Sequence, residues 1–141
     1  MSQRDVDLFI NRVKEKYGVD SVESNVEAGP GEDFKAHGGF SIEDGKYLYI
    51  YMSTETYSFM SVEYRVLIQH KSTAIQLYKA ANNVNNTCPG LKCVIDKYST
   101  KDVHLSFSME TSSKGDLNIN GLVDGLDILP TGGVFFLDSL K

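Results

Sequence analysis

The chain has 141 residues, of which 41% are hydrophobic and 23% are charged, and its formal net charge is -5 at pH 7. This length and composition are typical of one soluble globular domain and exclude a disordered segment. The longest apolar runs are too short to cross a bilayer, the chain has no basic cluster, and its first residues lack the pattern of a secretory signal. We therefore expect a cytoplasmic protein that binds neither a membrane nor a nucleic acid.

The first predicted element is an amphipathic helix near the N-terminus. Its apolar residues recur every three or four positions, at Val6, Phe9, Ile10, Val13 and Tyr17. Ser2 and Asp5 are placed to cap this helix, and Gly18 is placed to end it. The polar stretch 20–33, which contains several turn-forming residues, is predicted to be a surface loop.

From residue 34 the apolar spacing changes to two, which predicts a β-hairpin. Residues 34–42 and 47–52 form its strands, and Asp44-Gly45 is a favoured two-residue turn that would place Phe40 opposite Tyr49. One face of the hairpin then carries aromatic residues, and the other face carries Leu48, Ile50 and Met52. Both faces are partly apolar, so we expect both to meet something.

The remaining pattern predicts three more strands and two more helical regions. One strand covers about 59–68, and the next helix starts after Ser72 or Thr73. A second hairpin surrounds the turn at 99–102, and the C-terminal region is helical in two pieces broken at Pro130. The sequence therefore predicts a single α+β domain over 1–141, with helices flanking a five-stranded antiparallel sheet in the order α-β-β-β-α-β-β-α.

The asparagine-rich end of the second helix has the pattern A-x-N-x-x-N over 80–85 and is followed by the hairpin of 91–109. With the order of elements, these stretches resemble the YbjN-like family of bacterial sensory transduction regulators. They are also similar to class I type III secretion chaperones, which share that fold. The resemblance covers nearly the whole chain and implies a non-enzymatic protein, often dimeric, that acts by binding other proteins. The break around Pro130 departs from the continuous final helix that the resemblance implies.

The most specific local pattern is D-x-N-x-N-G-x-V-D-x-x-D over 116–127, which resembles the calcium loop of EF-hands and of dockerin repeats. Oxygen ligands at positions 1, 3, 5, 7, 9 and 12 with glycine at position 6 are what such a loop requires. The candidate ligands are Asp116, Asn118, Asn120, Leu122 through its carbonyl, Asp124 and Asp127. The alternative interpretation is a polar cap followed by the solvated face of an amphipathic helix. Calcium binding is therefore the alternative function, and otherwise we expect no cofactor.

We expect the functional surface to be the aromatic sheet face, which carries Phe40, Tyr47, Tyr49, Tyr51 and Tyr64. Tyrosine combines a large apolar ring with a polar tip and is enriched where proteins bind each other. Equally, these rings could pack under the helices and leave Leu48, Ile50 and Met52 to face a partner. The partner is a protein, with a second copy of the chain as one alternative.

No set of residues predicts an enzyme. The three histidines His37, His70 and His104 are far apart in the sequence, and none has a serine or cysteine nucleophile placed beside it. The two cysteines, Cys88 and Cys93, are separated by four residues, which matches neither a redox motif nor a zinc site. We expect two reduced thiols, with Cys93 facing a core, and no catalytic residues.

Overall fold

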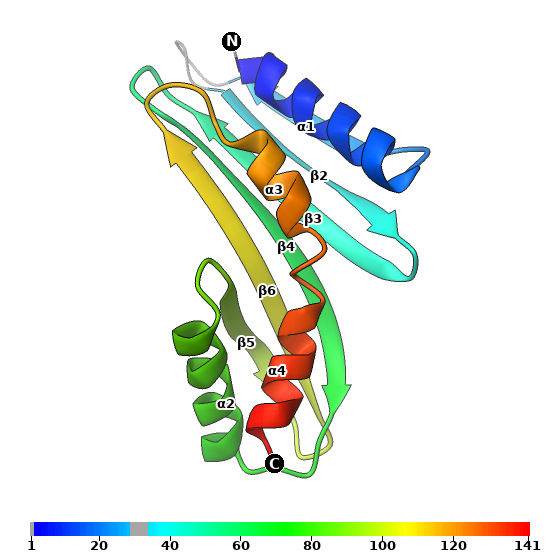
Figure 1. The fold of residues 1–141 in the computed structure, drawn as a ribbon, viewed down its shortest axis with the longest axis vertical. Helices are drawn as coiled ribbons and strands as arrows, with labels where there is room; N and C mark the ends of the chain where they lie inside the picture. Colours follow the sequence, from blue (N-terminus) through cyan, green and yellow to red (C-terminus); the bar gives the residue numbers. More distant parts are fainter. Residues whose placement is uncertain (1, 29–33) are drawn as a thin grey trace. The chain divides into compact units, whose positions relative to one another are not determined.

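The computed structural model describes residues 2–28 and 34–141 (Figure 1). The described residues form four helices and a six-stranded antiparallel sheet with the strand order β1-β2-β3-β4-β6-β5. The elements in chain order are α1 (Ser2–Tyr17), β1 (Glu23–Ala28), β2 (Phe34–Ile42), β3 (Gly45–Ser53), β4 (Ser58–Gln69), α2 (Ala74–Thr87), β5 (Lys92–Tyr98), β6 (Asp102–Ser113), α3 (Ile119–Gly125) and α4 (Thr131–Ser139). The predicted α+β class is confirmed.

The sheet has one strand more than the sequence predicted. Strand β1 lies within the stretch 20–33 that was predicted to be a loop, and residues 29–33 of that stretch lie outside the described residues. Strand β1 has a mostly polar sequence and pairs with β2 along its whole length, from Glu23 opposite Gly39 to Ala28 opposite Phe34. Backbone pairing rather than apolar burial holds β1, so the strand carries no alternating pattern that the sequence could show.

The β2–β3 hairpin forms as predicted, but its turn lies earlier in the chain. Ile42 pairs with Gly45, so the two turn residues are Glu43 and Asp44, and Glu43 has a positive φ of 55°. Phe40 therefore lies opposite Tyr47, not opposite Tyr49. The shift moves each partner by two residues, and because side chains alternate with a period of two, each residue stays on its predicted face.

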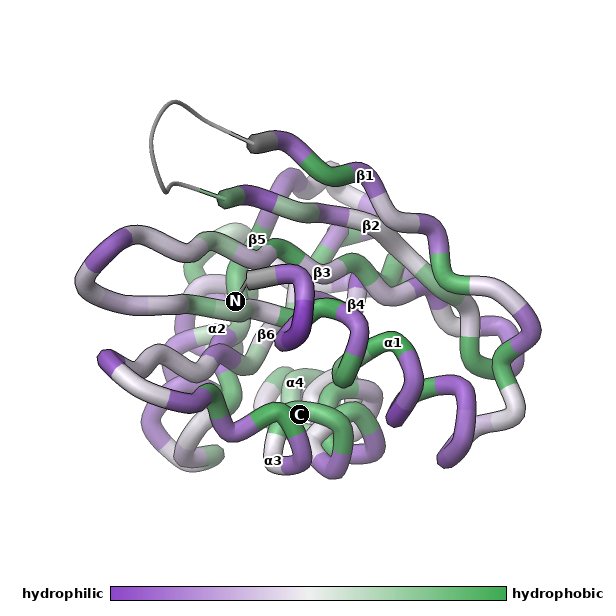
Figure 2. Tube along the Cα trace, turned by 90° about the horizontal axis from the view of Figure 1, so that it is seen from above, coloured by the Kyte–Doolittle hydropathy of each residue, from purple (hydrophilic) through white to green (hydrophobic). Residues whose placement is uncertain are grey.

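The chain divides into two compact units, residues 1–62 with 110–126 and residues 63–109 with 127–141. We call them the first unit and the second unit. In the first unit, α1 lies against β2 and α3 on one face of the sheet (Figure 1). Helix α1 alternates between hydrophobic and hydrophilic residues (Figure 2), and its Val6, Phe9 and Val13 are fully buried. The predicted first helix and its end before Gly18 are confirmed.

In the second unit, α2 packs on β5 and on α4. Thr73 begins α2 with a capping box, in which its side chain accepts from the N–H of Gln76 and the Gln76 side chain accepts from the N–H of Thr73. The predicted C-terminal break is confirmed, because α3 and α4 are separate helices and Pro130 directly precedes α4. None of the helices in the described part of the chain has the length and apolar character needed to span a membrane.

Candidate protein-binding face

In the first unit, the helices cover the aromatic face of the hairpin. Tyr47, Tyr49, Tyr51 and Phe40 are all buried, and Tyr64, which belongs to the second unit, is half-buried. Phe40, Tyr47, Tyr49 and Tyr51, which were predicted to belong to a binding surface, therefore form part of the core of the first unit. Of the two arrangements that the sequence left open, the hairpin adopts the one in which the tyrosines pack under a helix.

The tyrosines are held in this core through both their rings and their hydroxyl groups. The Phe9 ring of α1 packs against Phe40 and Tyr49, with ring centroids 6.0 and 5.5 Å apart. The Tyr49 hydroxyl donates to Ser24 Oγ and the Tyr51 hydroxyl donates to Asp5 Oδ2, both at 2.8 Å. Burial raises the pKa of both phenols above the usual value of 10.0. The hydroxyl tips thus bond inside the protein, which removes the need for a partner to satisfy them.

The opposite face of β3 carries exposed apolar side chains. Leu48 is 37% exposed, Ile50 is 54% exposed, and Met52 at the end of the same row is half-buried. We call these three residues the β3 stripe. Side chains alternate along a strand, so the stripe points away from the buried tyrosines and from the helices of the first unit. An exposed apolar row of this kind is a feature of surfaces that bind other proteins.

Each end of the β3 stripe carries a lysine. Lys46 lies two residues before Leu48 on the same face, and Lys35 of β2 pairs directly with Met52. Both lysines are exposed. The stripe is therefore an apolar row with a lysine at both ends, and Glu27 of β1 pairs with Lys35 on the same face.

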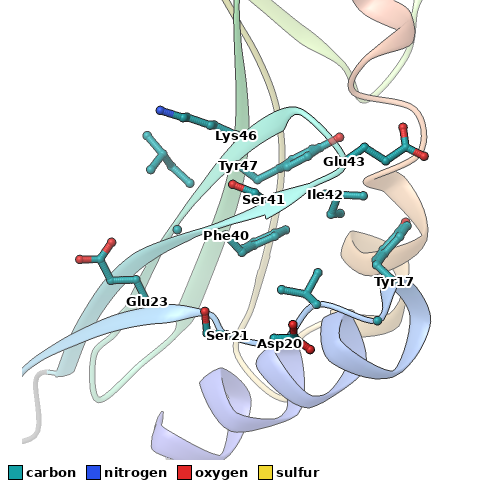
Figure 3. A pocket seen from close by; sticks show the side chains of 14 residues that line it. Tyr17, Asp20, Ser21, Glu23, Phe40, Ser41, Ile42, Glu43, Lys46 and Tyr47 are labelled. Atoms are coloured by element: carbon teal, nitrogen blue, oxygen red, sulfur yellow. The ribbon is translucent and has the colours of Figure 1, made fainter.

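A groove of about 660 Å³ adjoins the stripe, and Leu48 lines it. The groove runs between the segment that follows α1 and the turn end of the β2–β3 hairpin (Figure 3). Tyr17 and Glu43 lie at one end of it and Glu23 lies at the other. Its volume is within the range of small-molecule and peptide sites. Leu48 is the stripe residue that lines the groove, and Phe40 and Tyr47 of the buried face line it as well.

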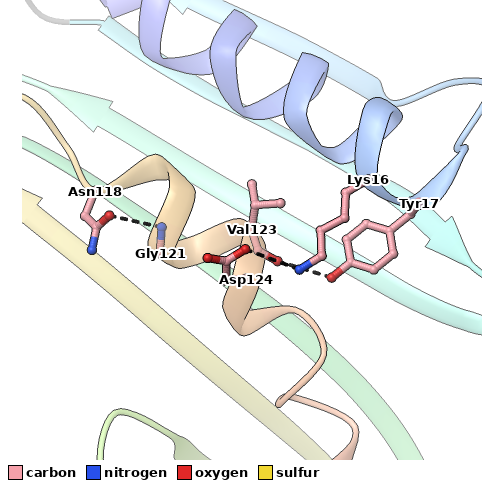
Figure 4. Close-up of polar contacts among 6 residues, drawn as sticks. All are labelled: Lys16, Tyr17, Asn118, Gly121, Val123 and Asp124. Carbon is pink, nitrogen blue, oxygen red and sulfur yellow. Dashed lines mark hydrogen bonds and ion pairs between the residues drawn. The ribbon is translucent and has the colours of Figure 1, made fainter.

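The predicted calcium loop is helical over most of its length. Asn118 caps α3, and its Oδ1 accepts from the N–H of Gly121 at 3.0 Å (Figure 4). Asp124 forms an ion pair with Lys16 of α1 at 3.3 Å, and the neighbouring Tyr17 hydroxyl donates to the carbonyl of Val123 at 3.2 Å. These contacts are those of a capped helix bound to α1, which is the alternative that the sequence had left open.

Three of the candidate calcium ligands, Asn120, Leu122 and Asp124, belong to helix α3. Asp116, Asn120 and Asp127 are exposed, and the side chain of Leu122 is buried in the core. Helical residues 119–125 cannot also wrap around an ion in the manner of a loop whose oxygen atoms converge. Within residues 2–28 and 34–141, no group of three or more histidine, cysteine, aspartate or glutamate residues could hold a metal ion.

Cys93 and His70 occupy structural positions. Cys93 is buried as predicted, and burial raises the pKa of its thiol to about 12, with the nearby Asp96 charge adding to the effect. Such a thiol carries little of the thiolate that a nucleophile needs. His70 uses both ring nitrogens on the backbone, because Nε2 faces the carbonyl oxygens of Ser99 and Asp102 and Nδ1 accepts from the N–H of Ser72.

The arrangement of helices and strands establishes the α+β class only. The resemblance to the YbjN-like family and to class I type III secretion chaperones stays a prediction. No family model, curated protein or solved structure matches this chain.

Proposed function

We propose that the chain is a non-enzymatic protein-binding module, regulatory or chaperone-like as the YbjN-type resemblance implies, which holds a partner protein on the outer face of the first unit. The observation that carries the proposal is the β3 stripe, whose Leu48 and Ile50 are exposed on a strand and whose Leu48 also lines the groove. Covering such side chains removes apolar surface from water, which is the main source of binding energy between proteins.

The charges around the stripe favour a different protein over a second copy of the chain. If two copies met stripe to stripe in the same direction, Lys46 would face Lys46. In the opposite direction, Lys46 of one copy would approach Lys35 of the other, since these lysines flank opposite ends of the row. Like charges brought together at a desolvated contact are unfavourable. We therefore propose a partner with an apolar centre and acidic side chains that reach Lys35 and Lys46.

The test compares two aspartate variants with equal starting exposure. Ile50 and Leu67 are each 54% exposed, but Ile50 belongs to the stripe and Leu67 lies on β4 in the second unit. Each immobilised variant and the wild type are incubated with extract of the cells that express the chain, and captured proteins are quantified by mass spectrometry. Ile50→Asp should reduce capture of the partner at least about tenfold, because a charge then replaces an apolar anchor.

The same partner should be captured equally by the wild type and by Leu67→Asp. With the partner purified, the double variant Lys35→Glu, Lys46→Glu should weaken binding in calorimetry, and more so at low salt. Equal capture by the wild type and Ile50→Asp would remove the stripe as the binding surface. Equal loss in both aspartate variants would show a general effect of surface charge rather than a site.

A further inference from the structure

Strand β5 is the outermost strand of the sheet on the side of the second unit, next to β6. A strand in this position has N–H and C=O groups that no neighbouring strand satisfies. Such groups are a template for pairing with another chain. Whether other groups of the chain bond with these outer N–H and C=O groups of β5 therefore decides whether two copies can pair through this strand.

The side chain of Asn85 occupies that edge. Its Oδ1 accepts from the backbone N–H of Cys93 at 2.6 Å, and its Nδ2 donates to the carbonyl oxygen of Cys93 at 3.0 Å. One carboxamide thus supplies the donor and the acceptor that a residue of an adjoining strand would supply. Just before the strand, the N–H of Leu91 donates to the carbonyl oxygen of Cys88 at 3.1 Å. The first half of the edge is closed by contacts within the second unit.

The contacts of Cys93 also show which residues of β5 face outward. In an antiparallel ladder, the backbone groups of successive residues point alternately to one side and the other. Because Cys93 bonds with Asn85, the backbone groups of Lys92 and Val94 point to β6 and those of Ile95 point to the outer edge. The register with β6 is regular from Lys92 to Ile95, and the bulge follows at Asp96.

We propose that β5 is a pairing surface for a second copy of this chain and that Asn85 keeps it closed. When Asn85 is withdrawn, the backbone groups of Cys93 and Ile95 are free to bond with Ile95 and Cys93 of the other copy. Val94, which is 41% exposed, then lies opposite itself. The two strands run antiparallel about a two-fold axis, which gives a closed dimer.

The charges on β5 match this register. With Val94 opposite itself, Lys92 of each copy approaches the bulge residue Asp96 of the other, whose Oδ2 accepts from Ser106 Oγ of its own chain, so opposite charges lie on both sides of the apolar contact. Moving the register by one pairing step in either direction loses these pairs. In one direction Lys92 faces Tyr98, and in the other it faces Val94. The outer edge of β5 is therefore complementary to the same strand of a second copy.

The test measures the oligomeric state of Asn85→Ala by size-exclusion chromatography with light scattering. This variant should show twice the mass of the wild type. Asn86→Ala is the matched control, since Asn86 is exposed, lies in the same turn of α2 and has no side-chain hydrogen bond among those of the described residues. Asn86→Ala should keep the wild-type mass. Adding Lys92→Glu to Asn85→Ala should abolish the dimer, because each new glutamate faces Asp96 of the other copy.

Asn85→Asp is a second variant that weakens the contact between residue 85 and the outer edge of β5. Its carboxylate still accepts from the N–H of Cys93 but repels the carbonyl oxygen, so this variant should also dimerise, more weakly than Asn85→Ala. A wild-type mass for both folded variants would overturn the proposal. Loss of folding in both, seen by circular dichroism, would overturn it too, because Asn85 would then be required for folding rather than for keeping copies apart. A dimer that survives Lys92→Glu would contradict the proposed register.

Discussion

Cys93 has a buried thiol, and its backbone N–H and C=O both bond with the side chain of Asn85. The N–H and C=O of Cys93 bond with Asn85, while its side chain points into the core of the second unit. Burial accounts for most of the rise in the pKa of the thiol, and the charge of Asp96 adds to it. The residue is therefore a structural element whose ionisation is coupled to folding.

We predict that the protein loses stability at alkaline pH through Cys93. The pKa of its thiol is raised from 9.0 to about 12, so between these values the unfolded chain loses this proton while the folded chain keeps it. The free energy of unfolding then falls as pH rises through this window, and the contribution is fully present below pH 9. Thermal melts of the wild type and of Cys93→Ala from about pH 8 to pH 11 measure the effect. This range covers about one unit below and two units above the normal pKa of a thiol.

The fall in melting temperature with pH should be smaller in Cys93→Ala than in the wild type. Tyr49 and Tyr51, whose pKa values are also raised by burial, remain in both proteins and supply the alkaline loss that both share. Cys88→Ala is the control, since Cys88 is half-exposed. Parallel melting curves for the wild type and Cys93→Ala would contradict the buried-thiol explanation.

At the scale of elements, the ends of the helices are fixed by side chains that the sequence displays. Thr73 closes the start of α2 through a capping box, and Asn118 begins α3 by accepting from Gly121. The same Asn118 also suits a calcium loop, because a cap and an ion need the same kind of oxygen atom. A short polar motif before an apolar run therefore fits both a helix start and a metal loop.

We predict that Asn118 acts on stability as a helix cap, whether calcium is present or not. Asn118→Ala should lower the free energy of unfolding by about 1 kcal/mol, the usual cost of losing a cap. Asn120→Ala is the matched variant, since Asn120 is the other asparagine of the predicted loop, is exposed and lies within α3 instead of at its N-cap. Urea unfolding of both variants in excess EDTA and in millimolar Ca²⁺ measures the effect.

In both buffers, only Asn118→Ala should be less stable than the wild type, and calcium should not change the wild-type midpoint. If calcium stabilised the wild type and both variants weakened that response, the predicted loop would be a metal site after all. Calorimetric titration with Ca²⁺ would then show heat.

Most elements could be predicted from the sequence because their signals are local. The helices follow from apolar spacing and caps, and the faces of the hairpin follow from alternation, which survives the two-residue shift of register. Strand β1 could not be predicted, because it is held by backbone bonds to β2 and has no apolar row. Gly38 marks this contact, since a Cβ there would collide with the carbonyl oxygen of Glu23.

The sequence could narrow the exposed face of the hairpin only to one of two alternatives, the tyrosine face or the face that carries the β3 stripe. Alternation places Tyr49 and Ile50 on opposite faces, but both rows are apolar, so the pattern alone does not say which row a helix covers. The choice depends on Phe9 of α1, which packs on the tyrosine row, and on Ser24 and Asp5, which bond with the hydroxyl groups. These are contacts between residues distant in sequence, and only the folded chain brings them together.

At the scale of the whole molecule, the two compact units carry two different proposed surfaces. The first unit offers the β3 stripe, with lysines at both ends, to a different protein. The second unit offers β5 to another copy and closes it with Asn85. The acidic net charge of -5 makes copies of the chain repel each other weakly, so the pairs between Lys92 and Asp96 would have to select the self-pairing register locally.

We predict that these two surfaces act independently. Ile50 and Asn85 belong to different compact units, so the effects of changing them should add. The double variant Ile50→Asp, Asn85→Ala should therefore dimerise as fully as Asn85→Ala and should fail to capture the partner, as Ile50→Asp does. Light scattering and capture from cell extract, carried out on one preparation, measure both properties. If adding Ile50→Asp abolished the dimer, the self-association would involve the β3 stripe. If Asn85→Ala alone lost partner capture, dimer formation and partner binding would be coupled.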